Sequence, residues 1–311
     1  MNRHPQPLCP FHPGLGERST ASRVFIYSQI NFMRLILIPI HVGCELQAKL
    51  AFDPVRQKTL FFFRHAESTW NDCKANGWFC FFRSFSFKDA ELSEVGEEQS
   101  KALSEKVTED PRKTLDLYDV KSGDIAFVTS NLRRAIATLV IGLNPLLRMF
   151  PKNKIYVLSS LQETSSGIDA HSMTLRKEKP PIVNWLDGRG MGALWDRIDA
   201  KYNLGDQSKF RDGSYKDRVR EFCWLIFNAP EFKNKEVIVA TGHSDWFKLF
   251  FKTFFPKNKG GNSVERTLKY KKLDNAAGVE MRIRWTQGTC RIVPTRTKEL
   301  FWSTPPSRST P

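Results

Sequence analysis

The sequence lacks the cysteine patterns that mark zinc sites and disulfide scaffolds. Six cysteines are spread over 311 residues. None of them forms a C-x-x-C pair or stands near histidines at zinc-ligand spacing. A chain of this length does not need disulfides to fold, so we expect reduced thiols, with a bond such as Cys73 to Cys80 as the alternative. We expect no metal and no cofactor.

Long uninterrupted apolar stretches are also missing. Residues 24–44 are apolar but contain Asn31, Arg34 and Pro39, so the run is too short to predict a membrane span. Three interpretations stay open for this segment: an element packed on the domain, part of a mitochondrial-type presequence, or a signal anchor. We predict a cytoplasmic protein, with mitochondrial targeting or membrane anchoring through residues 1–55 as the alternatives.

Acidic residues are in short supply. The chain has 33 of them against 48 lysines and arginines, which gives a net charge of +15. This excess favours anionic partners, and we expect a phosphorylated small molecule or a phosphoprotein as substrate. The basic residues form only short clusters, which are typical of solvated surfaces, so nucleic acid is not expected. A membrane partner depends on residues 24–44, and the sequence indicates no oligomeric state.

Short apolar runs that alternate with helix-like stretches define the predicted fold class. Such runs lie at residues 59–63, 125–128, 155–158 and 237–240. Continuous apolar runs of this length indicate strands buried on both faces, and their alternation with helices predicts a doubly wound α/β fold. We divide the chain into a flexible or targeting extension with one apolar element (1–55), a catalytic domain (56–292) with a helical insertion at about 165–232, and a C-terminal tail (293–311).

One predicted helix begins near Ser93 in the stretch SEVGEEQSKALSEKV. Serine is a favoured N-cap, acidic residues follow in the first turn, and a lysine stands near the end. Gly96 lowers the helix propensity of this stretch. This cost is offset only if another segment packs closely against Gly96.

Four predicted strand ends carry residues suited to phosphoryl transfer. Arg64 and His65 follow the first strand, an arginine pair follows the second, Glu163 follows the third, and His243 follows the fourth. Ligands of open α/β sheets bind outside the carboxyl ends of the strands. A neutral imidazole can attack phosphorus, and guanidinium groups bind phosphate oxygens, so we predict His65 as the nucleophile and Arg64 as a phosphate ligand.

The remaining site residues are assigned from the same chemistry. Arg133 and Arg134 point about 100° apart on a helix, so only one of them faces the site, and periodicity leaves the choice open. His243 would stabilise phosphoryl oxygens. Glu163 is the candidate general acid and base, with Glu67 and Asp245 as competitors. We expect Asp245 to act as an N-cap of the helix that follows His243.

The box RHAESTWN resembles the R-H-G-[EQ]-[ST]-x-x-N box of the histidine phosphatase superfamily, in the branch of the phosphoglycerate mutases. This resemblance implies a phosphorylated His65, with Arg64, Ser68 and Asn71 as phosphate ligands. The stretches DAELSEVGEEQSKAL and TSNLRRAIAT resemble two further family elements, and the second selects Arg134. The stretch LQE resembles the family segment that carries the acid, which implies this role for Glu163. The stretch VIVATGHSD resembles the strand with the second histidine, which implies that role for His243.

The resemblance covers roughly residues 58–285 and implies a three-layer αβα sandwich that needs no metal. Ser244, which we assign to substrate binding, stands where mutases usually have glycine. The chain has DCKANGWFCFFRSF and TSSGID where mutases have E-N-x-F-x-G-W and E-R-x-Y-G. We therefore predict hydrolysis of phosphomonoesters. Mutase-type phosphotransfer, or a catalytically weak protein that binds phosphorylated ligands, are the alternatives.

Overall fold

The computed structural model describes most of the predicted catalytic domain. It covers residues 55–76, 87–108, 111–165, 167–180, 191–206, 215–256 and 261–301. The apolar segment 24–44 and nearly all of the extension lie outside the described residues, as do parts of the predicted insertion and residues 302–311.

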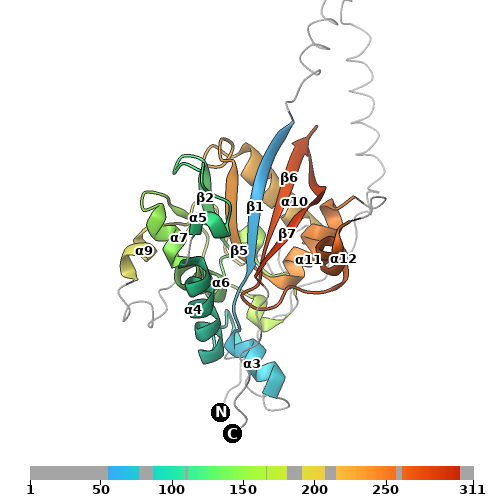
Figure 1. The fold of residues 1–311 in the computed structure, drawn as a ribbon. Coiled ribbons are helices and arrows are strands. Elements are labelled where there is room, and N and C mark those ends of the chain that lie inside the picture. Colours follow the sequence, from blue (N-terminus) through green and yellow to red (C-terminus); the bar gives the residue numbers. More distant parts are fainter. Residues whose placement is uncertain are drawn as a thin grey trace, which may run out of the picture. The chain divides into compact units, whose positions relative to one another are not determined.

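A seven-stranded mixed sheet forms the centre of the fold, in the order β4-β3-β2-β5-β1-β6-β7 (Figure 1). Its strands are β1 (Arg56–Arg64), β2 (Ile125–Thr129), β3 (Ile155–Val157), β4 (Ile198–Asp199), β5 (Val237–Gly242), β6 (Gly278–Thr286) and β7 (Thr289–Phe301). The strands from β4 to β1 pair in parallel, and β6 and β7 pair antiparallel. The prediction of a mostly parallel α/β sheet is therefore confirmed.

Helices cover both faces of this sheet and complete a three-layer sandwich (Figure 1). The α-helices are α3 (Thr69–Asn76), α4 (Glu94–Thr108), α5 (Pro111–Thr114), α6 (Arg133–Gly142), α7 (Asn144–Met149), α9 (Gly192–Asp196), α10 (Tyr215–Asn228), α11 (Ser244–Phe254) and α12 (Ser263–Tyr270). Buried side chains of α10, α11 and α12 pack on one face. Those of α4, α6 and α7 pack on the other.

Strand β1 shows how the sequence builds this sandwich. Leu60 and Phe62 join the core on the α11 side, whereas Phe61 and Phe63 join the core on the α4 side. Successive side chains of a strand point to opposite faces, so a continuous apolar run fills both cores. Each such buried side chain contributes roughly 1.5–3 kcal/mol relative to exposure. The strand is thereby fixed on both sides up to its last residue, Arg64.

The antiparallel hairpin of β6 and β7 was not predicted, and it corrects the C-terminal boundary. Strand β7 runs through residues 293–301, which we expected to be tail. The sequence did carry a signal, because Val279, Met281 and Ile283 alternate with polar residues and are buried in β6. In the structure, the turn that follows has positive φ at Gln287 and Gly288. Period-2 alternation followed by such a turn is typical of a hairpin.

The described part of the predicted insertion contains helices and one short strand. Within 165–232 the structure has the short 3-10 helix η4 (Ile168–Ala170), α9, the two-residue strand β4, and α10. Strand β4 pairs with β3 at the edge of the sheet, because Ile198 turns into the core beside Ile155. The region thus also extends the sheet.

The cysteines only partly follow the expected thiol state. Cys223 and Cys290 are free and buried. Cys73 is disulfide-bonded, so the expectation of reduced thiols is wrong for this residue. Cys80, the alternative partner that the sequence suggested, lies outside the described residues.

Helix α4 begins as the sequence predicts. The backbone N–H of Gly96 donates to the Ser93 hydroxyl over 3.1 Å, which makes Ser93 the N-cap. A Cβ on Gly96 would lie 1.9 Å from the carbonyl oxygen of Glu67. The loop that follows His65 therefore packs closely against this glycine.

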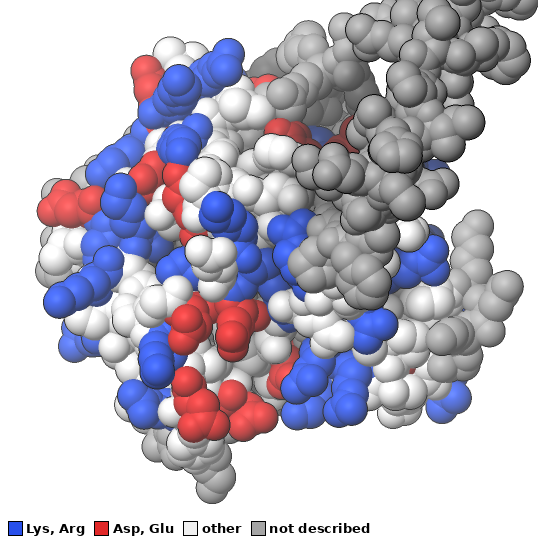
Figure 2. Space-filling view, turned by 90° about the horizontal axis from the view of Figure 1, so that it is seen from above, with Lys and Arg blue, Asp and Glu red and all other residues white. Residues whose placement is uncertain are grey.

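On one face of the molecule, basic side chains are more widespread than acidic ones (Figure 2). Figure 2 looks down on the view of Figure 1, and Lys and Arg spread widely over that face, whereas Asp and Glu gather in a few groups. Among the described residues, no helix is long and apolar enough to cross a bilayer.

Candidate active site

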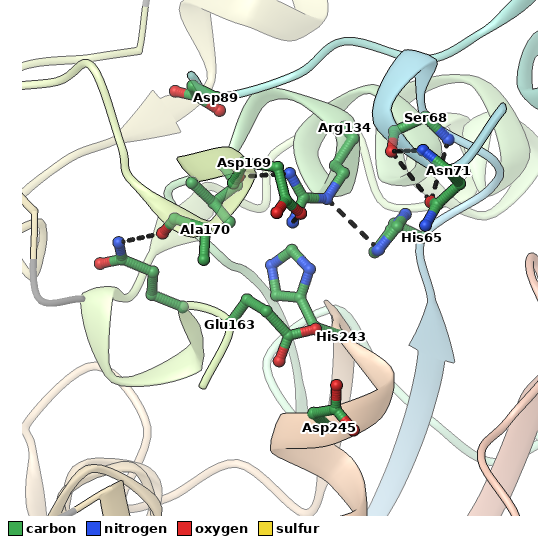
Figure 3. A network of polar contacts seen from close by, with 12 residues as sticks. His65, Ser68, Asn71, Asp89, Arg134, Glu163, Asp169, Ala170, His243 and Asp245 are labelled. Carbon is green, nitrogen blue, oxygen red and sulfur yellow. Dashed lines mark hydrogen bonds and ion pairs between the residues drawn. The ribbon is translucent and has the colours of Figure 1, made fainter. Parts of the chain in front are cut away.

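The carboxyl ends of three neighbouring strands bring the predicted site residues together (Figure 3). Strand β5 lies between β1 and β2, and Arg64 at the end of β1 is in register with Gly242 at the end of β5. His65 and His243 follow directly, and their ring centroids are 4.9 Å apart. Parallel pairing therefore places two histidines side by side although 178 positions, 243 minus 65, separate them in the chain.

The two nitrogens of the His65 ring differ in their hydrogen-bonding roles. Its Nδ1 lies 2.6 Å from the carbonyl oxygen of Ala66. A carbonyl only accepts hydrogen bonds, so Nδ1 carries the proton of the neutral ring. Nε2 then holds a lone pair, as a nucleophilic imidazole requires.

Arg134 faces His65, and Arg133 does not. The Nε–H of Arg134 donates to Nε2 of His65 over 3.3 Å, and the side chain is buried. Arg133 instead turns to Glu91 and to the carbonyl of Asp89. The structure thus decides the choice that periodicity left open, in favour of the arginine that the family resemblance selects.

His243 is held on one side and unpartnered on the other. Its Nε2 lies 2.9 Å from the hydroxyl of Ser130 at the end of β2. Its Nδ1 is buried and has no hydrogen-bond partner within the described part of the chain. A serine hydroxyl can donate to Nε2, which leaves the ring proton on Nδ1 as a donor.

Arg64 is anchored through one end of its guanidinium group. Nη1 donates to the carbonyl of Leu273 over 2.6 Å. Nε is buried without a partner among the described residues. Buried polar groups are normally hydrogen-bonded, so the unpartnered Nε of Arg64 and Nδ1 of His243 are features that an anionic ligand would satisfy.

Both histidines are kept neutral by their surroundings. Burial is the main cause that lowers the pKa of His65 well below its ordinary value of 6.5, and the positive charges of Arg134 and Arg64 lower it further. Burial, Arg134 and the neighbouring His65 lower the pKa of His243 in the same way. A neutral His65 is the form that can attack phosphorus.

Glu163 lies in a setting that favours its protonated form. It follows the 3-10 helix η3 (Ser159–Leu161) and is buried. Its Oε1 accepts hydrogen bonds from the backbone N–H groups of Thr164 at 2.7 Å and Trp246 at 3.2 Å. Burial nevertheless raises the pKa of Glu163 above its ordinary value of 4.5, and the charge of Asp245 adds to this effect.

The three residues assigned to substrate binding lie at the rim of this cluster. The Ser68 hydroxyl donates to Oδ1 of Asn71 over 2.9 Å, and both lie beside His65 in Figure 3. Ser244 is buried and is the first residue of α11. The helix begins directly after His243, so the positive end of its dipole favours an anion near the site.

Two competing acids have other partners. Asp245 does not cap α11, because His243 is the N-cap and no side chain caps the helix. Asp245 instead pairs with Lys272 at 2.7 Å, so the predicted capping role is wrong. The carboxylate of Glu67 accepts a hydrogen bond from the Ser93 hydroxyl at 2.9 Å.

Sequence reasoning missed four residues of the site. They are Ser130, Thr138, Asp169 and Arg218. Ser130 stands in the box TSNLRRAIAT, so that signal was available but unused. Asp169 pairs with Arg134, and Thr138 accepts from the backbone N–H of Ala66 at 3.0 Å. Arg218 donates to the carbonyl of Glu163 at 3.3 Å, and no local pattern indicated it.

The arrangement can hold an anion but offers no set of metal ligands. Among the described residues, no three His, Cys, Asp or Glu side chains are grouped so that they could hold a metal ion. The inner side chains are two imidazoles, two guanidinium groups and a carboxyl. This is a set of donors and proton carriers suited to a phosphoryl group.

Comparison with solved structures finds phosphatases and a phosphoglycerate mutase among the similar chains. A mycobacterial glucosyl-3-phosphoglycerate phosphatase is 18% identical, with 78% of this chain and 99% of that chain covered and a TM-score of 0.38. A phosphoglycerate mutase from Bacillus anthracis is 15% identical (77% and 93% covered, TM-score 0.42). A phosphoserine phosphatase from Entamoeba histolytica is 13% identical (77% and 96% covered, TM-score 0.37).

No protein-family model and no curated protein matches the sequence. What the site does is therefore argued from its own residues.

Proposed function

We propose that the chain is a phosphatase that hydrolyses phosphomonoesters through a phosphohistidine intermediate on His65, without a metal ion. One observation carries this proposal. The buried, neutral His65 has Nδ1 bonded to the Ala66 carbonyl and Nε2 directed at Arg134, with His243 beside it. A nucleophile and its anion-binding groups thus meet at one atom.

In the first step Nε2 of His65 attacks phosphorus and the bond from phosphorus to the leaving oxygen breaks. Glu163 donates its proton to that oxygen, so an alcohol departs and Glu163 is left ionised. The raised pKa of Glu163 keeps that proton available before the reaction. The hydrogen bond from Nδ1 to Ala66 stabilises the positive charge that develops on the ring.

In the second step a water molecule attacks the phosphorus of phosphohistidine. Glu163 takes the proton of this water, the bond from phosphorus to Nε2 breaks, and inorganic phosphate leaves. His65 and Glu163 return to their starting protonation states, so the cycle balances. Arg64, Arg134 and His243 face the phosphoryl oxygens in both steps and stabilise the charge that builds up on them.

Hydrolysis is proposed rather than transfer to a second substrate hydroxyl because the mutase stretches are absent from the sequence. The test uses the full chain with p-nitrophenyl phosphate in excess chelator, and it measures released inorganic phosphate together with the acid-labile phosphoenzyme. We expect steady release of phosphate by the wild type and none above background by His65→Ala. Activity that needs an added divalent metal, or that survives in His65→Ala, would contradict the proposal.

A further inference from the structure

Asp169 accepts hydrogen bonds from Arg134, the arginine that would bind the phosphoryl group in the proposed reaction. Its backbone carbonyl accepts from Nη1 of Arg134 at 2.7 Å, and its carboxylate oxygen Oδ2 accepts from Nη2 at 3.2 Å. Both side chains are nearly inaccessible, with 1% of Arg134 and 10% of Asp169 exposed. Figure 3 shows the Asp169 carboxylate next to the Arg134 guanidinium group, with His243 nearby.

The donors of Arg134 are shared between His65 and Asp169. Nε donates to Nε2 of His65, while Nη1 and Nη2 donate to Asp169. A phosphoryl group on Nε2 lies next to the Nε and Nη2 edge of this guanidinium group, because Nε already touches Nε2. Phosphate and the Asp169 carboxylate therefore compete for the same donors, and their negative charges repel each other.

The main chain around Asp169 is fixed, so only its side chain is free to leave. The carbonyl of Ala170 accepts from the Gln162 amide at 2.7 Å, and the backbone N–H of Met173 donates to Asp89 at 3.1 Å. A Cβ on Gly167 would lie 2.4 Å from Oδ1 of Asp169, so a side chain there would crowd the carboxylate. The glycine leaves room for the carboxylate in the observed position.

We propose that Asp169 is an internal anion that occupies Arg134 between turnovers and is displaced by the phosphoryl group. It lowers the affinity of the site for phosphate, so that product phosphate leaves readily. The carbonyl of Asp169 keeps Arg134 aimed at His65 while the carboxylate swings away. This inference rests on the proposed function for the position of the phosphoryl group.

The test measures binding of inorganic phosphate by calorimetry, which needs no turnover. Asp169→Asn keeps the size and the acceptor oxygen but removes the charge, and Asp169→Ala removes the whole side chain while the backbone carbonyl stays. We expect both variants to bind phosphate about tenfold more tightly than the wild type. The inhibition constant for phosphate in p-nitrophenyl phosphate hydrolysis should fall by the same factor.

The matched control is Glu91→Gln, which neutralises the acid paired with the adjacent Arg133. Its phosphate affinity should equal that of the wild type. Alanine has no donor, so tighter binding by Asp169→Ala cannot come from a new hydrogen bond. Melting curves show which of the two Asp169 variants is folded. One folded variant is enough to test the inference.

Unchanged or weaker phosphate binding in a folded Asp169 variant would overturn the inference, as would an equal gain in Glu91→Gln. The proposed function fails separately. If the wild type does not hydrolyse phosphomonoesters but Asp169→Asn still binds phosphate more tightly, the proposed phosphatase activity is refuted. The competition between Asp169 and phosphate for Arg134 is then still supported.

Discussion

Arg134 and His65 form a hydrogen bond in which the guanidinium Nε–H donates to the imidazole Nε2 at 3.3 Å. This bond aims the lone pair of the nucleophile at the group that would hold its phosphoryl oxygens. It also keeps a positive charge beside the ring, and this charge opposes protonation of His65. This contact therefore orients the nucleophile, and its charge adds to burial, which is the main cause of the lowered pKa of His65.

The two adjacent arginines should differ sharply on substitution. Lysine keeps the charge but loses the planar fork of donors. Arg134→Lys should lower kcat/KM for p-nitrophenyl phosphate by about 10²–10³. Arg133→Lys should change it little, because Arg133 contacts Asp89 and Glu91. Equal losses of kcat/KM in Arg134→Lys and Arg133→Lys would contradict the assignment of Arg134 as the arginine that faces His65.

Loss of the Glu163 carboxyl group should slow hydrolysis most for substrates whose leaving group needs a proton to depart. In Glu163→Gln the amide oxygen still accepts from Thr164 and Trp246, but no proton is available for the departing oxygen. Hydrolysis of an alkyl phosphate should fall by about 10²–10⁴. Hydrolysis of p-nitrophenyl phosphate should fall less, because nitrophenolate leaves without a proton. Asp245→Asn loses the ion pair with Lys272 and one of the smaller effects that raise the pKa of Glu163, while burial, the main cause, stays. This variant should therefore retain most activity on both substrates.

The activity should depend on pH through two groups, His65 and Glu163. His65 must be neutral, and its lowered pKa keeps it so below pH 6.5, so the acid limb of kcat/KM should lie below that value. Glu163 must be protonated, and its raised pKa keeps it so above pH 4.5, so activity should fall as pH rises through the shifted pKa. Glu163→Gln should remove this basic limb. A basic limb that survives unchanged in Glu163→Gln would contradict the assignment.

Gly96 should be required for both stability and activity. The Cβ of Gly96→Ala would lie 1.9 Å from the Glu67 carbonyl, so the loop that carries His65 and Ser68 must move. We expect a loss of about 1–3 kcal/mol in the free energy of unfolding and a clear fall in kcat. Gly123→Ala is the control, because a Cβ there meets nothing within 4 Å. Denaturant titration and initial rates measure both effects.

Several features of the fold were predictable because they depend on residues close together in the chain. The apolar runs that became β1, β2, β3 and β5 are local patterns, and their exact ends differ by only a few residues. The Ser93 cap is a bond to the backbone of Gly96 three positions later. The alternation and turn of β6 and β7 were equally local, and they were overlooked.

Other features became visible only when distant segments met. The structure places His65 beside His243 because β5 lies next to β1 in the sheet, and strand order is not written in any local pattern. No sequence pattern indicates Asp169, because its role depends on a contact with Arg134, which lies 35 positions away. Asp245 looked like a helix cap until Lys272 was found beside it.

The class of fold, the strand-end positions of the reactive groups and the cap at Ser93 could thus be predicted from the sequence, because burial patterns and short-range hydrogen bonds act over a few residues. The tertiary structure settled which arginine faces His65, which nitrogen of that ring holds the lone pair, and which acid pairs with the guanidinium group of Arg134. These depend on contacts between side chains far apart in the chain, and the sheet order and packing of the layers set those contacts.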